Sequence, residues 1–501
     1  MANKKKQQFG DWVKCLVMLL GGIVYFLIIL AVLNKGLDFC HVGILVLFII
    51  TLILYFKNSK QIINFYHKHT KMMKIIMIIL IGFGFLMRFS LLMMQDKLIT
   101  MEKLSDTGVH WYGAQQIVED GQFDQEIGDY ERLFPYLSSY TGSLAISMSI
   151  FGENYSAVLF LNIFFDVIAC IAIYYLFCVW KGDNRIALVA ATFWGVNPLQ
   201  IIFCGLPLAI VVVNMCVVLS ILSVCLLFKG KEKITKTFAF SLLSGALFAL
   251  GNAFRPIFII FVLATIVCWA MVVLNDKKEL KVAVCSCLVL VLSYGIVGLL
   301  PSIAHTQFNP YYSGEKARPG WGIYIGANYE TSGRWSSNDS NNFFGPILSE
   351  QADNDIEEAQ SIVMAVAMNR YVNIIGQGKL LQHFFNKTTT LFGDVKNSIY
   401  DFSRIFDIKK SNQLYLIIQD AILVFYYGIL MMIFYEIFLI LKKKKFKFKD
   451  DTINYLVVLL VGLFMAFLLV ESMNRYSLPF VAILLIIALG FADREKQLDV
   501  I

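Results

Sequence analysis

The sequence contains few charged residues. Asp, Glu, Lys and Arg make up 16% of its 501 residues, whereas soluble domains average about 25%. This composition excludes the chain of several soluble domains that its length would otherwise suggest. The apolar residues instead form repeated runs of about 18–25, long enough to cross a bilayer as helices that satisfy their own backbone hydrogen bonds. The sequence therefore predicts an all-α polytopic membrane protein.

Cysteine is absent from the two long polar segments, 95–155 and 305–412. All ten cysteines lie in or beside apolar runs, which excludes a disulfide framework in those segments. Cys285 and Cys287 have no second ligand pair, so we interpret them as packing residues and not as a zinc site. The first apolar run is longer than the core of a signal peptide and has no small-residue cleavage site, so we expect it to be retained.

The apolar runs predict about twelve transmembrane helices. Lysines cluster before the first run, in the gap at 57–74, and again at 229–236, 277–281 and 442–445. By the positive-inside rule these regions are cytoplasmic. The predicted spans are 12–33, 40–57, 75–94, 156–180, 186–203, 207–228, 237–254, 256–275, 282–304, 413–441, 452–470 and 477–493.

The charge distribution favours the same orientation. The segment 95–155 carries a net charge of −7 and 305–412 carries −1, while the rest of the chain carries +15. With both termini cytoplasmic, the two long segments are external. The positive surplus then reflects topology and contact with anionic lipid, not nucleic acid. The predicted parts are a tail with three spans (1–94), a first external loop (95–155), a six-span membrane core (156–304), a second external loop domain (305–412), and three C-terminal spans with a cytoplasmic tail (413–501).

Both external loops are predicted to contain helices. The topology requires that 137–152 does not cross the membrane; this stretch is short and contains serines and glycine, so we expect a helix in the outer interface. A thirteenth span is the alternative. In the second loop, the acids between Asp353 and Glu358 favour the start of a helix. Gly376 and Gly378 end it, and a second helix runs from Leu380 to Leu391.

Asp106 is the acid that the sequence places best for catalysis. It lies about a dozen residues beyond an outward-going span, where the chain turns back toward the membrane surface. A carboxylate held there can take a proton from a hydroxyl acceptor. The alternative is structural, because Ser105 or Asp106 before a helical pattern also suits a helix N-cap.

Other polar residues allow two interpretations each. The six acids from Glu119 to Glu131 match no calcium-loop spacing, so we interpret them as a solvated face. Arg255 and Arg475 lie at predicted outer membrane boundaries, where a guanidinium can bind two phosphate oxygens. The structural alternatives are snorkelling to the interface or, for Arg475, an ion pair with Glu471 one turn earlier.

Several segments, in their order along the chain, resemble the GT-C superfamily of glycosyltransferases that use polyprenyl-phosphate sugars. The similarity is greatest to bacterial members of glycosyltransferase family 39, the protein-mannosyltransferase-like group, and covers about residues 75–493. One departure is that Thr107 follows Asp106 where many relatives have a second acid. The matching elements are Ser105 to Ala114, Tyr130 to Pro135, Phe151 with Gly152, Leu161 with Asn162, Phe254 to Pro256, Gly322 to Asn328, Gly333 to Trp335 with Asp339, and Glu471 to Tyr476.

The resemblance implies an inverting transfer of a sugar from a polyprenyl-phosphate donor to a hydroxyl of an envelope polymer, glycolipid or protein. The site faces the outside of a cell membrane, and the lysine- and isoleucine-rich, proline-poor sequence is typical of bacteria. Asp106 would be the catalytic base, and Arg255 and Arg475 would bind the donor phosphate. No cofactor is required, and a divalent metal is left open. The implied acceptor or sugar contacts are Trp111, Tyr112, Asn328, Trp335, Glu471 and Tyr476.

Three other functions are compatible with the sequence. A polysaccharide polymerase or ligase would depend on loop residues such as Arg334 and His383 instead of Asp106. A secondary transporter or flippase would use an intramembrane acid such as Asp166, although internal repeats are not visible. Such an isolated acid more often bonds a neighbouring helix. A non-enzymatic scaffold is the third alternative.

Overall fold

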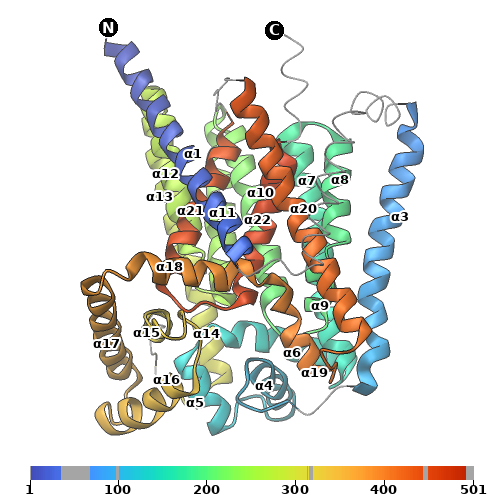
Figure 1. The fold of residues 1–501 in the computed structure, drawn as a ribbon, viewed down its shortest axis with the longest axis vertical. Coiled ribbons are helices and arrows are strands. Elements are labelled where there is room, and N and C mark those ends of the chain that lie inside the picture. The colour runs from blue at the N-terminus through green and yellow to red at the C-terminus, as the bar shows by residue number, and fades with distance from the viewer. Residues whose placement is uncertain are drawn as a thin grey trace.

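The protein consists of a bundle of long helices with a layer of shorter helices at one end. A computed structural model describes residues 2–34, 68–97, 101–312, 314, 320–443 and 450–491. All regular secondary structure in these ranges is helical. The long helices run side by side, and the shorter ones gather at the end of the bundle that lies away from the start of α1 (Figure 1).

Eight helices within the described ranges are long and apolar enough to cross a membrane. Two further apolar helices, α12 and the last helix, are shorter. The chain is therefore a multi-pass helical membrane protein. The eight candidates lie in α1 (Ala2–Asn34), α3 (Thr70–Phe89) with η1 (Ser90–Lys97), α7 (Tyr155–Lys181), α10 (Ile210–Lys229), α11 (Ile234–Phe254), η2 (Lys277–Glu279) with α13 (Leu280–Val297) and α14 (Leu299–Phe308), α20 (Gln413–Lys443) and α21 (Asp451–Leu469), and the shorter two are α12 (Ile259–Asn275) and η6 (Asn474–Ser477) with α22 (Leu478–Phe491).

The span predicted at 186–203 is broken. It consists of α8 (Asn184–Gly195) and α9 (Pro198–Cys204), and the helix axis bends by 51° between them. Proline starts a helix readily but cannot continue one, and the side chain of Asn197 caps α9 by accepting from Leu199 N at 3.0 Å. Counted as one span, the pair gives a ninth candidate. The span predicted at 40–57 lies outside the described residues, and every other predicted span falls on an apolar helix.

Helix α10 forms the centre of the bundle. It packs against α7, α11 and α22, and most of its residues are buried on every side, as expected for an apolar helix without a polar face. Helix α11 packs against α13, while α1 packs against α12 and α21. By contrast, α3 lies at the edge of the bundle (Figure 1), and most of its side chains are exposed as a lipid-facing surface would require.

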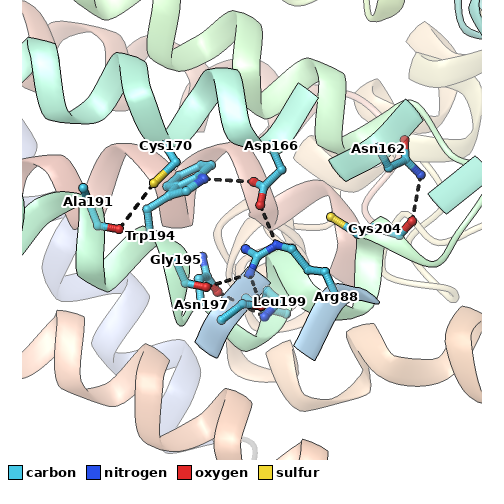
Figure 2. A network of polar contacts seen from close by, with 11 residues as sticks. Arg88, Asn162, Asp166, Cys170, Ala191, Trp194, Gly195, Asn197, Leu199 and Cys204 are labelled. Atoms are coloured by element: carbon cyan, nitrogen blue, oxygen red, sulfur yellow. Dashed lines mark hydrogen bonds and ion pairs between the residues drawn. The ribbon is translucent and has the colours of Figure 1, made fainter. Parts of the chain in front are cut away.

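A buried ion pair attaches α3 to the bundle. Arg88 Nε donates to Asp166 Oδ2 on α7 at 2.7 Å, and both side chains are completely buried. Trp194 Nε1 donates to the other oxygen of Asp166 at 2.9 Å, and Arg88 Nη1 donates to Gly195 O at 2.6 Å (Figure 2). A Cβ at Gly84 would lie 2.0 Å from Gly195 O, so only glycine permits this close helix contact. Asp166 thus bonds a neighbouring helix, as the structural interpretation of this acid predicted.

The shorter helices form a layer that we call the helical cap. Both long polar segments contribute to it, and they lie at the same end of the bundle (Figure 1). Helix α6 has 15 residues, too few to cross a bilayer. The first segment forms α4 (Asp106–Asp120), α5 (Gln125–Leu133) and α6 (Leu137–Phe151), and the second forms α15 (Gly320–Gly326), α16 (Ser337–Asn342), η3 (Phe343–Gln351), α17 (Ile356–Gly376), α18 (Leu380–Thr388), η4 (Thr389–Gly393), η5 (Val395–Ile399) and α19 (Tyr400–Ile405).

The helices of the second segment follow the predicted pattern closely. Helix α17 begins after Asp355, whose carboxylate caps it by accepting from Glu358 N at 3.0 Å. It ends at Gly376, and Gly378 has a φ of +67°, a conformation that glycine adopts without strain. Helix α18 then begins at Leu380.

Candidate functional site

Asp106 is the first residue of α4, and it does not cap this helix. The cap is Ser105, whose Oγ accepts from Gly108 N at 3.1 Å. A Cβ on Gly108 would lie 1.9 Å from Glu102 O, so the chain can fold back tightly before α4 only because residue 108 is glycine. Of the two residues considered as N-cap, Ser105 takes that role, which leaves the Asp106 carboxylate available for contacts outside its helix.

Arg475 connects Asp106 to a second aspartate. Its Nη2 contacts Asp106 Oδ2, and its Nη1 donates to Asp401 Oδ2 of α19 at 3.0 Å. The side chain of Arg475 is 12% exposed, whereas that of Asp106 is 44% exposed. The guanidinium is therefore committed to two carboxylates, and Asp106 still faces solvent. The ion pair with Glu471, one of the structural alternatives for Arg475, does not form, because Glu471 lies before η6 and accepts from Tyr476 Oη at 3.0 Å.

The cationic neighbour determines the charge of Asp106. The Arg475 guanidinium lowers the pKa of this carboxyl below its ordinary value, an effect that outweighs desolvation, and Arg255 acts in the same direction. Asp106 is thus ionised throughout the neutral and mildly acidic range. An ionised, partly exposed carboxylate can accept a proton from a bound hydroxyl.

Arg255 is placed differently from Arg475. Its guanidinium lies over the ring of Tyr476 at 3.9 Å from the centroid, and Arg475 lies near the same ring at 5.7 Å. No carboxylate of the described residues lies within ion-pair distance of Arg255. The Tyr476 ring therefore holds one arginine that already has acidic partners and a second arginine whose N–H donors are available for an anionic ligand.

A cleft of about 390 Å³ opens next to Arg255. Asn252, Ala253 and Pro256, which flank Arg255 in the chain, line one side of it. Tyr136 lines it too and is close enough to Arg255, Asp106 and Glu471 that their charges act on its phenol. The cleft and the charged cluster are thus adjacent. The remaining lining residues are Pro135, Ala249, Tyr294, Gly295, Gly298, Leu299, Pro301, His305 and Tyr312, so no Asp, Glu, Lys or Arg is among them.

The prediction that the acids from Glu119 to Glu131 form a solvated face is wrong for one of them. Glu131 is completely buried. Its carboxyl contacts Ser138 Oγ, and Thr141 Oγ1 lies 3.4 Å from its other oxygen. Burial without a cation raises the pKa of Glu131 to about 8. The other acids behave as predicted where the structure pairs them at the surface, as when Lys103 contacts Asp124 at 2.5 Å and Glu126 at 2.7 Å.

His305 shares the hydroxyl of Ser138 with Glu131. Its Nδ1 contacts Ser138 Oγ, and its ring lines the cleft. All three side chains are buried. Sequence reasoning missed this cluster, since its members lie on α5, α6 and α14 and no local spacing relates them.

The segment that joins α21 to η6 is held in place by hydrogen bonds to the second polar segment. Glu471 N donates to Gly322 O at 2.8 Å, and Lys387 Nζ donates to Gly326 O at 2.9 Å and Val470 O at 2.7 Å. Burial lowers the pKa of Lys387 to about 7. His383 Nε2 also contacts Gly326 O, at 3.0 Å. These bonds fix the backbone from which Glu471 and Arg475 extend.

The predicted site residues therefore fall into two groups. Asp106, Arg255, Arg475, Glu471 and Tyr476 converge at one place. The other predicted contacts are spread over the cap: Asn328 Nδ2 donates to Asp339 at 2.7 Å, Tyr112 Oη donates to Met101 O at 3.2 Å, Trp111 packs against the core, and Trp335 is 52% exposed.

The described residues contain no group of three His, Cys, Asp or Glu side chains arranged to hold a metal ion. Comparison with known proteins finds no matching family, no matching characterised protein and no matching solved structure. The geometry of the charged cluster and the cleft is therefore what indicates the function.

Proposed function

We propose that this chain is a membrane glycosyltransferase of the GT-C type, with about twelve spans. It transfers a sugar, with inversion, from a polyprenyl-phosphate donor to a hydroxyl of an envelope polymer, glycolipid or protein on the outer face of a bacterial membrane. One observation carries the proposal: an ionised carboxylate, Asp106, and a cation without an acidic partner, Arg255, belong to one charged cluster around Arg475 and Tyr476, and this cluster lies next to a cleft lined by Tyr136.

Arg255 is the residue assigned to the donor phosphate. Its planar guanidinium can give two parallel hydrogen bonds to phosphate oxygens, and no carboxylate competes for them. Arg475 is assigned a positioning role, because Asp106 and Asp401 already occupy its donors. The sequence assigned both arginines to the donor phosphate, whereas the contacts favour phosphate binding for Arg255 and positioning of Asp106 for Arg475.

Asp106 is assigned the role of general base. The acceptor hydroxyl attacks the anomeric carbon, the bond from that carbon to the phosphate oxygen breaks, and the lipid phosphate leaves with the electron pair. The hydroxyl proton passes to Asp106. A hydroxyl becomes strongly acidic as its oxygen bonds to carbon, so a carboxylate of low pKa suffices as base, and this low pKa keeps it free of other protons.

The competing functions draw less support from the contacts. Arg334 is exposed and donates to Thr331 O of its own loop at 3.3 Å, and His383 is buried against Gly326 O. Neither takes part in the ion pairs and ring contacts of the charged cluster, which involve Asp106, Arg255, Asp401, Arg475 and Tyr476. Both oxygens of Asp166 accept hydrogen bonds, from Arg88 and Trp194, which leaves this acid committed to helix packing instead of ion transport.

The proposal is tested by comparing envelope polymers of cells with and without the gene. The expected result is the loss of one sugar from one polymer, glycolipid or protein, restored by the wild-type gene and by Asp120→Asn but not by Asp106→Asn. Unchanged sugars in the deletion strain, measured across all envelope fractions, contradict the proposal.

A further inference from the structure

The Glu131–Ser138–His305 cluster connects a buried acid to the wall of the cleft. Ser138 Oγ contacts Glu131 Oε2 on one side and His305 Nδ1 on the other. Glu131 has no cation within ion-pair distance in the described residues, and its side chain is inaccessible to solvent. His305 forms part of the cleft lining. The catalytic roles assigned above make no use of these three residues.

A serine between an acid and an imidazole permits two arrangements of the same protons. In the first, Glu131 carries its proton and donates to Ser138, which donates to His305 Nδ1, and both end groups are neutral. In the second, the Glu131 proton has moved to Ser138 Oγ and the serine proton has moved to His305 Nδ1. The acid is then a carboxylate and the imidazole an imidazolium. No heavy atom has to move, and no proton is gained or lost.

The surroundings favour the neutral arrangement while the cleft is empty of anions. Burial disfavours the carboxylate form of Glu131. Among the described residues, the titratable side chains next to the cluster include His110 of α4, bonded to Thr141 Oγ1 at 2.9 Å, and Tyr312, whose ring lies 4.1 Å from that of His305 between centroids, while Tyr136 and Tyr294 line the cleft together with His305. Burial holds the pKa of His110 at about 4, so it adds no charge at neutral pH.

An anion in the cleft reverses this preference, because it attracts the imidazolium. The lining suits the head group of a phosphodiester amphiphile. It contains the Asn252 amide and three tyrosine hydroxyls but no carboxylate, and Arg255 lies beside it. Gly298 and Leu299 also line the cleft, and apolar side chains next to them in the chain, Ile296 and Leu300, are exposed.

We propose that the cleft binds a phosphodiester head group and that Glu131 protonates His305 through Ser138 when it does so. The inference rests on the proposed function in taking the donor phosphate as the natural ligand. Part of the positive charge that faces this phosphate, the imidazolium of His305, then forms only on binding. In the empty protein the cleft therefore holds no buried imidazolium that would need a permanent counter-ion.

The experiment measures protons exchanged on binding. Titration calorimetry of the purified full-length protein in two buffers of different ionisation enthalpy gives the number of protons taken up per ligand. The probe is farnesyl methyl phosphate, a diester with one negative charge that does not titrate near neutrality. A short-chain phosphatidylglycerol, which shares the diester but not the isoprenoid, serves as the second arm and shows which class of lipid the cleft prefers.

We expect wild-type protein to bind the probe at pH 7 with almost no net proton uptake. Uptake should rise toward one proton as the pH passes about 8, where Glu131 loses its own proton. Glu131→Gln should instead take up a proton from solvent already at pH 7, and its affinity should fall as pH rises. His305→Gln should abolish uptake at every pH. Asp129→Asn, a matched change at an exposed acid of α5, should behave as wild type.

Two results overturn the inference. One is a proton count for wild type that stays flat from pH 6 to 9, a test that needs no variant. The other is an identical count in Glu131→Gln and wild type. If either occurs while Arg255→Lys weakens probe binding, the relay is wrong and the donor site stands. If neither probe binds, both the relay and the proposed donor site are wrong.

Discussion

Arg88 and Asp166 form an ion pair of 2.7 Å in which both side chains are fully buried, and it joins α3 to α7. Helix α3 also packs against α8 and α9, but its other faces are largely exposed. Removing one member of a buried pair leaves the other charge uncompensated, which costs about 3–5 kcal/mol. We therefore expect Arg88→Leu or Asp166→Leu alone to lower the thermal midpoint of the purified protein strongly.

The double variant Arg88→Leu with Asp166→Leu should recover most of that loss, because no unpaired charge remains. Arg185→Leu provides the control. Arg185 pairs with Asp183 at 2.9 Å near the surface, where such pairs contribute no more than about 1 kcal/mol. Equal effects for the Arg88 and Arg185 variants would contradict a stabilising role for the buried pair.

The orientation is tested with single cysteines in a cysteine-free background. Ser337 is exposed in the cap, and Glu232 is exposed in the turn between α10 and α11 at the other end of the bundle. The neighbouring Ser336 is left unchanged because its hydroxyl caps α16. In intact cells an impermeant thiol reagent should label Ser337→Cys and not Glu232→Cys. The opposite labelling would reverse the topology and place the candidate site inside the cell.

The two arginines should differ when each is changed to lysine. Arg255→Lys keeps the charge but loses the planar pair of donors, so the apparent Kd for the lipid donor should rise about tenfold, the equivalent of one charge-assisted hydrogen bond. Arg475→Lys should lower kcat with little change in donor affinity, because it disturbs Asp106 and not the phosphate. Arg404→Lys, at an exposed residue of α19, is the control. Normal donor affinity in Arg255→Lys would exclude it as the phosphate ligand.

The protonated state of Glu131 makes stability depend on pH. Its pKa of about 8 in the folded protein exceeds the ordinary value of 4.5. Between these values the folded state holds one more proton than the unfolded state, so this group's contribution to stability falls as pH rises from about 4.5 through 8. Relative to wild type, Glu131→Gln should gain thermal stability as the pH is raised across this range. A difference in midpoint that does not change with pH would show that Glu131 is ionised in the folded protein.

The membrane fold could largely be predicted from the sequence, because lipid requires long apolar helices and their runs are visible. The break at Pro198 is the exception, where a proline and a capping asparagine interrupt an apolar run. The site was predictable only in part. Asp106 and Arg475 are far apart in the chain, and nothing local shows that they meet or that Asp401 joins them. Glu131 stands in a run of acids that looks solvated, and its burial depends on α6 and α14.

The most direct test of the central claim is the turnover of Asp106→Asn with the correct donor and acceptor. The amide keeps the size of the carboxylate, and Ser105 keeps the helix cap, but the amide cannot accept the proton. Turnover should fall roughly 10²–10⁴-fold, the contribution of a positioned base, while expression and donor binding persist. Asp120→Asn and Asp124→Asn should remain near wild type. Wild-type turnover in Asp106→Asn would contradict the assignment of Asp106 as the catalytic base.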